Sequence, residues 1–201
     1  MTARQTPYPA GVFHVRMPAV IWTAALDEVR RYARIDAQTA RRGSEGLVYL
    51  AGVPTADALV VTGLFRLDHR PQGDRVMPTQ PEVRWLLSML QARDEKLVAQ
   101  LHTHRHGALH SRGDDRMATS FHDGFLSIVA PNFADGVERL DQCIVHEYRN
   151  GTFRSLSAEE TAARFTIYDQ IIDRPQIPST AEVAQWRRFV QRLRSIAHRR
   201  R

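Results

Sequence analysis

The sequence has few of the features that mark secreted, disulfide-bonded or membrane proteins. Cys143 is the only cysteine, so no disulfide can form within the chain and thiolates alone cannot hold a zinc ion. No run approaches the roughly 18 apolar residues that a membrane span needs, and residues 1–16 lack the apolar core of a secretory signal. These absences predict a cytoplasmic protein with no membrane partner.

Lysine is also nearly absent, since Lys96 is the only one, and arginine carries the rest of the positive charge. The net charge is +6, and residues 179–201 account for all of it with seven arginines and one acid. Residues 1–178 balance 21 basic against 21 acidic side chains. A neutral body does not present the basic surface that nucleic-acid binding requires, so we expect no nucleic-acid partner.

The periodicity of apolar residues predicts helices and strands interspersed along the chain. This order favours an α/β fold, with a mixed β-sheet flanked by helices. The first helix is expected to turn Val20, Ala24 and Val29 inward, and Cys143 is expected to be an inert, buried thiol within a strand. The predicted helices are 19–40, 80–95, 114–121, one opening at the capping box 157–160, and 181–198; the predicted strands are 46–51, 58–67, 96–101, 125–131, 140–148 and 152–156.

Two domains of unequal size are expected. Residues 1–174 form the main domain, and the prolines at 175 and 178 separate it from an extra C-terminal helix over 179–201. This helix is basic and amphipathic, with arginines opposite an apolar face that includes Trp186 and Phe189. Such a face either packs on the main domain or binds a partner.

A His-x-His pair follows the predicted strand 96–101, with a serine and an acid a few residues later. His102 and His104 lie two residues apart, and alternate side chains of a strand share a face, so both imidazoles could bind one ion. Asp114 would supply a carboxylate ligand, and a water would complete a tetrahedral catalytic zinc site. Ser111 and Asp114 also match an N-terminal helix cap, and a capping hydroxyl could in addition donate to an oxyanion.

A zinc hydrolase also needs a general base, and Glu45 is the candidate. It stands at the start of the predicted strand 46–51, in the stretch Gly-Ser-Glu-Gly-Leu-Val-Tyr-Leu. The alternative is an exposed glutamate in a helix-to-strand turn. As a base, its carboxylate would take a proton from water and pass it to the leaving amine.

This arrangement resembles the JAMM motif of JAB/MPN zinc metalloproteases, over roughly residues 19–170. The matching features are Glu45 before its strand, then His102-Thr103-His104, then Ser111-x-x-Asp114. The resemblance implies an MPN fold, which is similar to that of cytidine deaminases. It also implies Zn²⁺ ligated by the two histidines and Asp114, Glu45 as the general acid/base, and Ser111 stabilising the tetrahedral intermediate.

The chain departs from the common pattern between the histidines and the serine. Six residues separate His104 from Ser111 where seven are usual, and Arg105 replaces a common proline. The stretch 108–115 is nevertheless similar to bacterial, stand-alone members of the Mov34/MPN/PAD-1 group. Asp115 is an alternative ligand, although the three-residue step from Ser111 favours Asp114. The loop histidines His106 and His110 either stay in solvent or orient the ligands.

The resemblance implies a deubiquitinase-like isopeptidase. Its substrate would be a bacterial ubiquitin-like protein, either conjugated to a target or carrying a C-terminal extension. Stand-alone members are encoded beside E1/E2-like proteins, often for antiviral defence against phage, and these proteins are the expected partners. Two alternatives remain at this point: a metallopeptidase acting on sulfur-carrier proteins, and a catalytically silent MPN scaffold.

Overall fold

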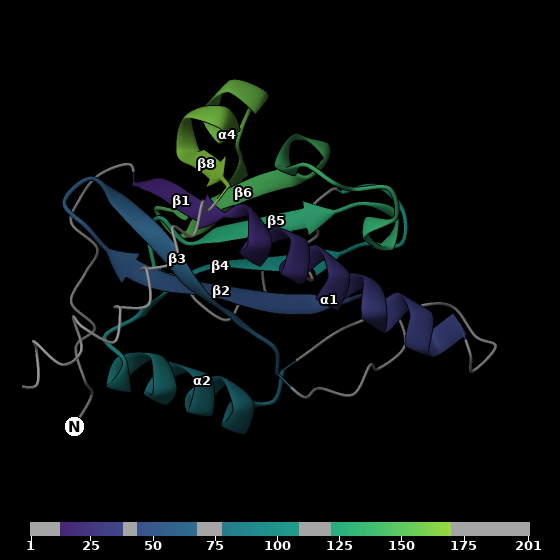
Figure 1. The fold of residues 1–201 in the computed structure, drawn as a ribbon, viewed down its shortest axis with the longest axis horizontal. Coiled ribbons are helices and arrows are strands. Elements are labelled where there is room, and N and C mark those ends of the chain that lie inside the picture. The colour runs from purple at the N-terminus through teal and green to yellow at the C-terminus, as the bar shows by residue number, and fades with distance from the viewer. Residues whose placement is uncertain (1–12, 38–43, 68–77, 109–121, 170–201) are drawn as a thin grey trace, which may run out of the picture. The chain divides into compact units, whose positions relative to one another are not determined.

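The protein is an α/β fold built on an eight-stranded mixed sheet, seen in a computed structural model that describes residues 13–37, 44–67, 78–108 and 122–169 (Figure 1). The strand order is β7-β6-β5-β4-β2-β3-β1-β8. The strands are β1 His14–Pro18, β2 Leu47–Pro54, β3 Ala58–Phe65, β4 Lys96–Thr103, β5 Leu126–Ala130, β6 Ile144–Arg149, β7 Thr152–Ser155 and β8 Phe165–Tyr168. The helices are α1 Ala19–Ala37, α2 Gln80–Ala92 and α4 Ala158–Arg164, with 3-10 turns η1 Asn132–Ala134 and η2 Leu140–Gln142.

Both faces of the sheet are covered, and each carries its own apolar cluster. In Figure 1, α1 lies across the sheet over β2 and β4, and α2 lies at the lower side of the view. Val48 and Leu50 of β2 pack with α1, whereas Leu47 and Tyr49 pack with Leu86 of α2. This alternation follows from the two-residue period of a strand buried on both sides. The strands at the centre of the sheet therefore have apolar side chains packed on both faces.

Capping residues set where two of the helices begin. The predicted capping box of α4 is confirmed: Ser157 Oγ accepts a hydrogen bond from the Glu160 amide at 3.2 Å, and Glu160 Oε2 accepts one from the Ser157 amide at 2.8 Å. Thr79 and Glu82 form the same reciprocal pair at the start of α2. Each box satisfies amide groups that the first turn of a helix leaves without partners.

The predicted core face of the first helix is partly wrong. Val20 is 64% exposed and Ala24 is also exposed, while Val29 is fully buried as expected. The buried stripe instead begins at Trp22 and continues through Ala25, Leu26, Val29 and Tyr32. Trp22 fixes this rotation, because its ring is buried and its Nε1 donates to the Glu138 carbonyl oxygen at 2.8 Å.

The predicted strand 140–148 begins too early. Residues 140–142 form the 3-10 turn η2, and β6 starts at Ile144, so Cys143 precedes the strand rather than lying within it. Gln142 explains the difference, since its Oε1 accepts hydrogen bonds from the amides of Glu138 and Arg139 and closes a turn there. The hairpin itself is confirmed, with Asn150 and Gly151 both at positive φ between β6 and β7.

Two strands of the sheet lie outside the sequence predictions. β1 pairs in parallel with both β3 and β8, so this edge of the sheet unites residues 14–18 with residues 165–168. The predicted helices 114–121 and 181–198 lie outside the described residues, as does Gly43. No described helix is long and apolar enough to cross a membrane. Chain contacts divide the protein into units 1–169 and 170–201, and the boundary at residue 174 stays a prediction.

Candidate metal centre

The two histidines of the predicted site lie at the end of β4 on one face. His102 is 7% exposed, His104 is half-buried, and their ring centroids are 5.1 Å apart with planes tilted by 60°. Two imidazole nitrogens bound to one tetrahedral zinc at about 2.0–2.1 Å would put the ring centroids about 5 Å apart. The spacing of this pair therefore fits a shared ion.

The pairing of β2 with β4 brings Glu45 to the same place. Leu47 lies opposite His102, and the Thr103 amide donates to the Gly46 carbonyl oxygen at 3.0 Å, which extends the antiparallel register by one residue. Continued by one more residue, the same register would set Glu45 opposite His104. Residues directly opposite in an antiparallel pair project on the same face. Glu45 is half-buried there.

Gly46 and Thr103 hold this part of the register, and sequence reasoning assigned neither of them a role. A Cβ on Gly46 would lie 2.4 Å from the Val29 carbonyl oxygen, so the backbone of α1 packs directly on this glycine. Thr103 is fully buried, and its Oγ1 accepts a hydrogen bond from the Gly46 amide at 2.8 Å. Both contacts lie on the α1 face, which leaves Glu45 and the histidines on the opposite face. The only signal in the sequence was a glycine directly after the glutamate.

The backbone of His104 is fixed from the side away from β2. Its amide donates to the Ala130 carbonyl oxygen at 3.0 Å, and its carbonyl oxygen accepts from the Phe133 amide at 2.9 Å. β4 ends at Thr103, so these two bonds extend the ordered strand conformation to the second histidine. The turn η1, which follows β5, thus belongs to the construction of the site.

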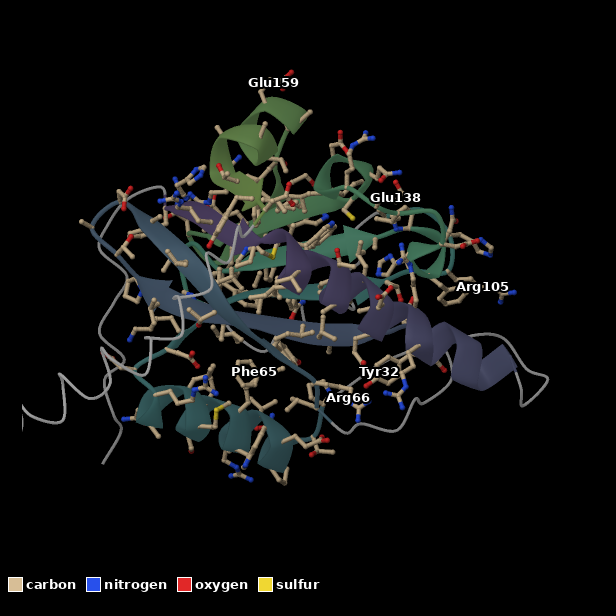
Figure 2. All side chains as sticks on the ribbon, viewed as in Figure 1. Tyr32, Phe65, Arg66, Arg105, Glu138 and Glu159 are labelled. Carbon is tan, nitrogen blue, oxygen red and sulfur yellow. The ribbon has the colours of Figure 1, made fainter. Side chains whose placement is uncertain are left out.

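Ser111 and Asp114, with Asp115 and His110, lie outside the described residues. Within the described ranges, no group of three or more histidine, cysteine, aspartate or glutamate side chains is arranged to hold a metal ion. The part of the predicted centre that the structure describes is therefore the histidine pair and Glu45. His106 is exposed in the segment that follows, and Arg105 lies at the periphery of the molecule (Figure 2).

Buried polar groups continue along the same face of the sheet beneath the histidines. Gln100, two residues before His102, is 3% exposed, and its Nε2 donates to Ser127 Oγ at 3.1 Å. Across the next pair of strands, Ser127 lies opposite His146, and the ring Nδ1 of His146 is 3.1 Å from Ser155 Oγ. The site therefore stands at the end of a polar row that spans β4 to β7.

Cys143 has no part in this centre. It lines a separate cavity of about 390 Å³ between η2, β6, α4 and β8, together with apolar side chains such as Val145 and Phe165. Burial, followed by the nearby charge of Asp141, raises the pKa of the thiol to about 12. The raised pKa is that of an inert thiol, as the sequence predicted, but Cys143 is half-buried and not fully buried.

Two histidines on one face of the sheet, beside the strand that follows Glu45, are donor groups suited to a metal-dependent hydrolase. A curated relative, the probable metalloprotease y4jG of Sinorhizobium fredii, is 34% identical over 113 residues, which cover 54% of this chain and 68% of that protein. The chain belongs to the family of this metalloprotease, and that family implies a metal cofactor. No protein-family model matches the chain.

The fold also occurs among solved structures. The solution structure of protein DSY2949 from Desulfitobacterium hafniense superposes with a TM-score of 0.55 and 12% identity, over 80% of this chain and 97% of that one. At this level of identity the similarity concerns the fold alone.

Proposed function

We propose that the protein is a zinc-dependent isopeptidase or peptidase of the JAB/MPN type. Its JAMM residues are Glu45, His102, His104, Ser111 and Asp114. One observation carries the proposal: β2 pairs with β4 so that Leu47 lies opposite His102 and Gly46 bonds to Thr103, and one further step of this register would set Glu45 opposite His104. This arrangement would bring a base beside two metal ligands that lie 57 and 59 positions further along the sequence. The family relationship to a probable metalloprotease supports the same reaction class.

In this proposal His102, His104 and Asp114 hold Zn²⁺, which supplies Lewis acidity and lowers the pKa of water towards neutrality. Glu45 takes a proton from the attacking water and delivers it to the nitrogen of the leaving amine. Ser111 donates a hydrogen bond to the oxyanion that forms at the scissile carbonyl.

The proposed substrate is a bacterial ubiquitin-like protein, cleaved after its C-terminus in a conjugate or an extended precursor. Its proposed setting is the cytoplasm, beside E1/E2-like proteins of the same operon, in defence against phage. This assignment rests on the motif alone. A peptidase acting on sulfur-carrier proteins would use the same site, so only an experiment can distinguish the two substrate classes.

The test combines metal content with cleavage of a bacterial ubiquitin-like protein that carries a C-terminal peptide extension. Wild-type protein should copurify with zinc and remove the extension. Glu45→Gln should keep the zinc and lower kcat by about 100-fold or more, because only the proton transfer is lost. Glu159→Gln, an exposed change on α4 (Figure 2), is the matched control and should retain full activity.

Full activity of Glu45→Gln would contradict the mechanism. Absence of zinc from folded wild-type protein would contradict the metal centre. Cleavage of a sulfur-carrier precursor, with no cleavage of ubiquitin-like proteins, would keep the centre and replace the proposed substrate.

A further inference from the structure

The turn η1 has a backbone conformation that requires support. Asn132, Phe133 and Ala134 have φ values of 51°, 55° and 62°, so three successive residues with side chains adopt the left-handed region. L-amino acids visit this region singly and at a cost, which neighbouring structure must offset. The turn follows β5 directly, and it lies against His104 through the hydrogen bond from the Phe133 amide.

Helix α1 provides that support through two long side chains. Arg30 Nε donates to the Ala134 carbonyl oxygen at 2.9 Å, and Arg30 Nη2 donates to the carbonyl oxygen of Val137. Trp22, two turns earlier on the same helix, donates to the carbonyl oxygen of Glu138, a residue marked in Figure 2. Asp27 accepts from Arg30 Nη1 at 3.2 Å and orients the guanidinium. The planar fork of Arg30 thus bonds the last carbonyl group of the turn and that of Val137, three residues further along the chain.

The turn η1 contacts the backbone of His104, one of the two predicted histidine ligands, but not that of His102. The carbonyl oxygen of His104 accepts from Phe133, whereas His102 lies within β4 and pairs with β2 and β5. His104 lies past the end of β4, so the bonds to Ala130 and Phe133 define its backbone position. A chain of contacts therefore runs from α1 through Arg30 and η1 to His104.

We propose that Arg30 is a positioning residue for His104, acting through the left-handed turn at 132–134. The inference rests on the proposed function in that His104 is taken as a zinc ligand. Without the two guanidinium bonds, the turn can relax towards commoner backbone angles and withdraw the Phe133 amide. The His104 imidazole then loses its fixed direction, and a ligand held less firmly binds its metal less tightly.

The experiment compares Arg30→Met with Arg31→Met in the full chain. Arg31 is the next residue of the same helix, but its side chain is 61% exposed and its ion pair with Glu28 is 3.9 Å long. Zinc affinity is measured by competition with a chromophoric chelator. Arg30→Met should bind zinc about 10-fold more weakly or worse, and Arg31→Met should match wild type. Arg30→Lys should recover part of the loss, because an ammonium lacks the planar fork.

Amide hydrogen exchange of the metal-free proteins gives a second readout that needs no zinc. In Arg30→Met, the amides of Phe133 and His104 should exchange at least about 10-fold faster, while the Leu101 amide in β4 keeps its wild-type rate. Equal acceleration at Leu101 would overturn the inference, because it would indicate general destabilisation. Wild-type zinc affinity in Arg30→Met would also overturn it. If wild-type protein binds no zinc, the proposed function fails, and unchanged exchange at Phe133 and His104 would separately overturn the positioning role.

Discussion

At the scale of single residues, Gly46 shows how little space separates the candidate base from the helix behind it. Any side chain there would collide with the backbone of α1 at Val29, and backbone atoms cannot step aside as a flexible side chain can. Thr103 holds the amide of the same glycine from β4. Two neighbours on the far face of the sheet thus help to set the backbone position next to Glu45.

His122 makes stability depend on pH. Burial, the largest effect, lowers its pKa to about 4, against an opposing effect of Asp123. An unfolded chain binds the proton near pH 6.5, whereas the folded chain does not bind it until about pH 4. The histidine's contribution is therefore present above pH 6.5 and is lost as pH falls through this window. Between pH 7 and pH 4 the loss should be roughly 2–3 kcal/mol.

Urea unfolding of metal-free protein, with chelator present, measures this contribution. His122→Gln should unfold with a smaller drop in free energy between pH 7 and pH 4 than wild type, since glutamine does not titrate. Other titrating groups are common to both proteins and cancel in the difference. If the free energy of unfolding falls equally with pH in wild type and His122→Gln, burial of His122 is not the cause of the pH dependence.

At the scale of elements, a buried carboxylate joins α4 to the sheet. Glu147 of β6 is 1% exposed and accepts hydrogen bonds from Arg149, Arg154 and Arg164, the last of which is 3% exposed. Burial lowers the pKa of Arg164, and the charge of Glu147 opposes this shift. The end of α4 is therefore attached to β6 by an ion pair that has little access to water.

Glu147→Gln should destabilise the protein by about 3–5 kcal/mol, because it leaves the Arg164 charge buried without a counter-charge. Adding Arg164→Met should recover most of the loss. Asp141→Asn is the matched control: its pair with Arg139 is 2.9 Å long but exposed on both sides, so its removal should change the stability little. Denaturant unfolding measures all three. A double variant as unstable as the single one would contradict this explanation.

The elements also show where sequence reasoning reaches its limit. β2, β4 and α2 were predictable because each is a long segment whose apolar residues recur at the spacing of its secondary structure and are buried. β1 and β8 have only five and four residues, and their pairing with each other depends on contacts between the two ends of the sheet. The rotation of α1 depends on Trp22 reaching the Glu138 carbonyl, a contact 116 positions away.

The candidate site divides in the same way. His102 and His104 could be predicted as a pair because strand alternation is local. Glu45 was proposed from its place before strand 46–51 and from resemblance to a motif, and the register of β2 would bring it towards the histidines. Arg30 gave no signal, because a helix arginine that bonds to a distant turn looks the same in sequence as a solvated one.

At the scale of the whole molecule, the proposed zinc site would join β4 to the segment that contains Asp114, and its ligands come together only in the folded chain. Metal that binds the folded state and not the unfolded state stabilises the protein by mass action, by about 2.7 kcal/mol at 100 times the dissociation constant. For a chain of this size each kcal/mol raises Tm by about 2–4 °C, so saturating zinc should raise Tm by about 5–10 °C. Calorimetry of chelator-treated protein, with and without zinc, measures the shift.

His102→Ala should abolish this rise in Tm with zinc, and the exposed change His106→Ala should preserve it. Magnesium, which prefers oxygen ligands, should give no shift. An equal zinc shift in His102→Ala would place the metal elsewhere on the chain, since weak binding to unfolded histidines lowers Tm rather than raising it.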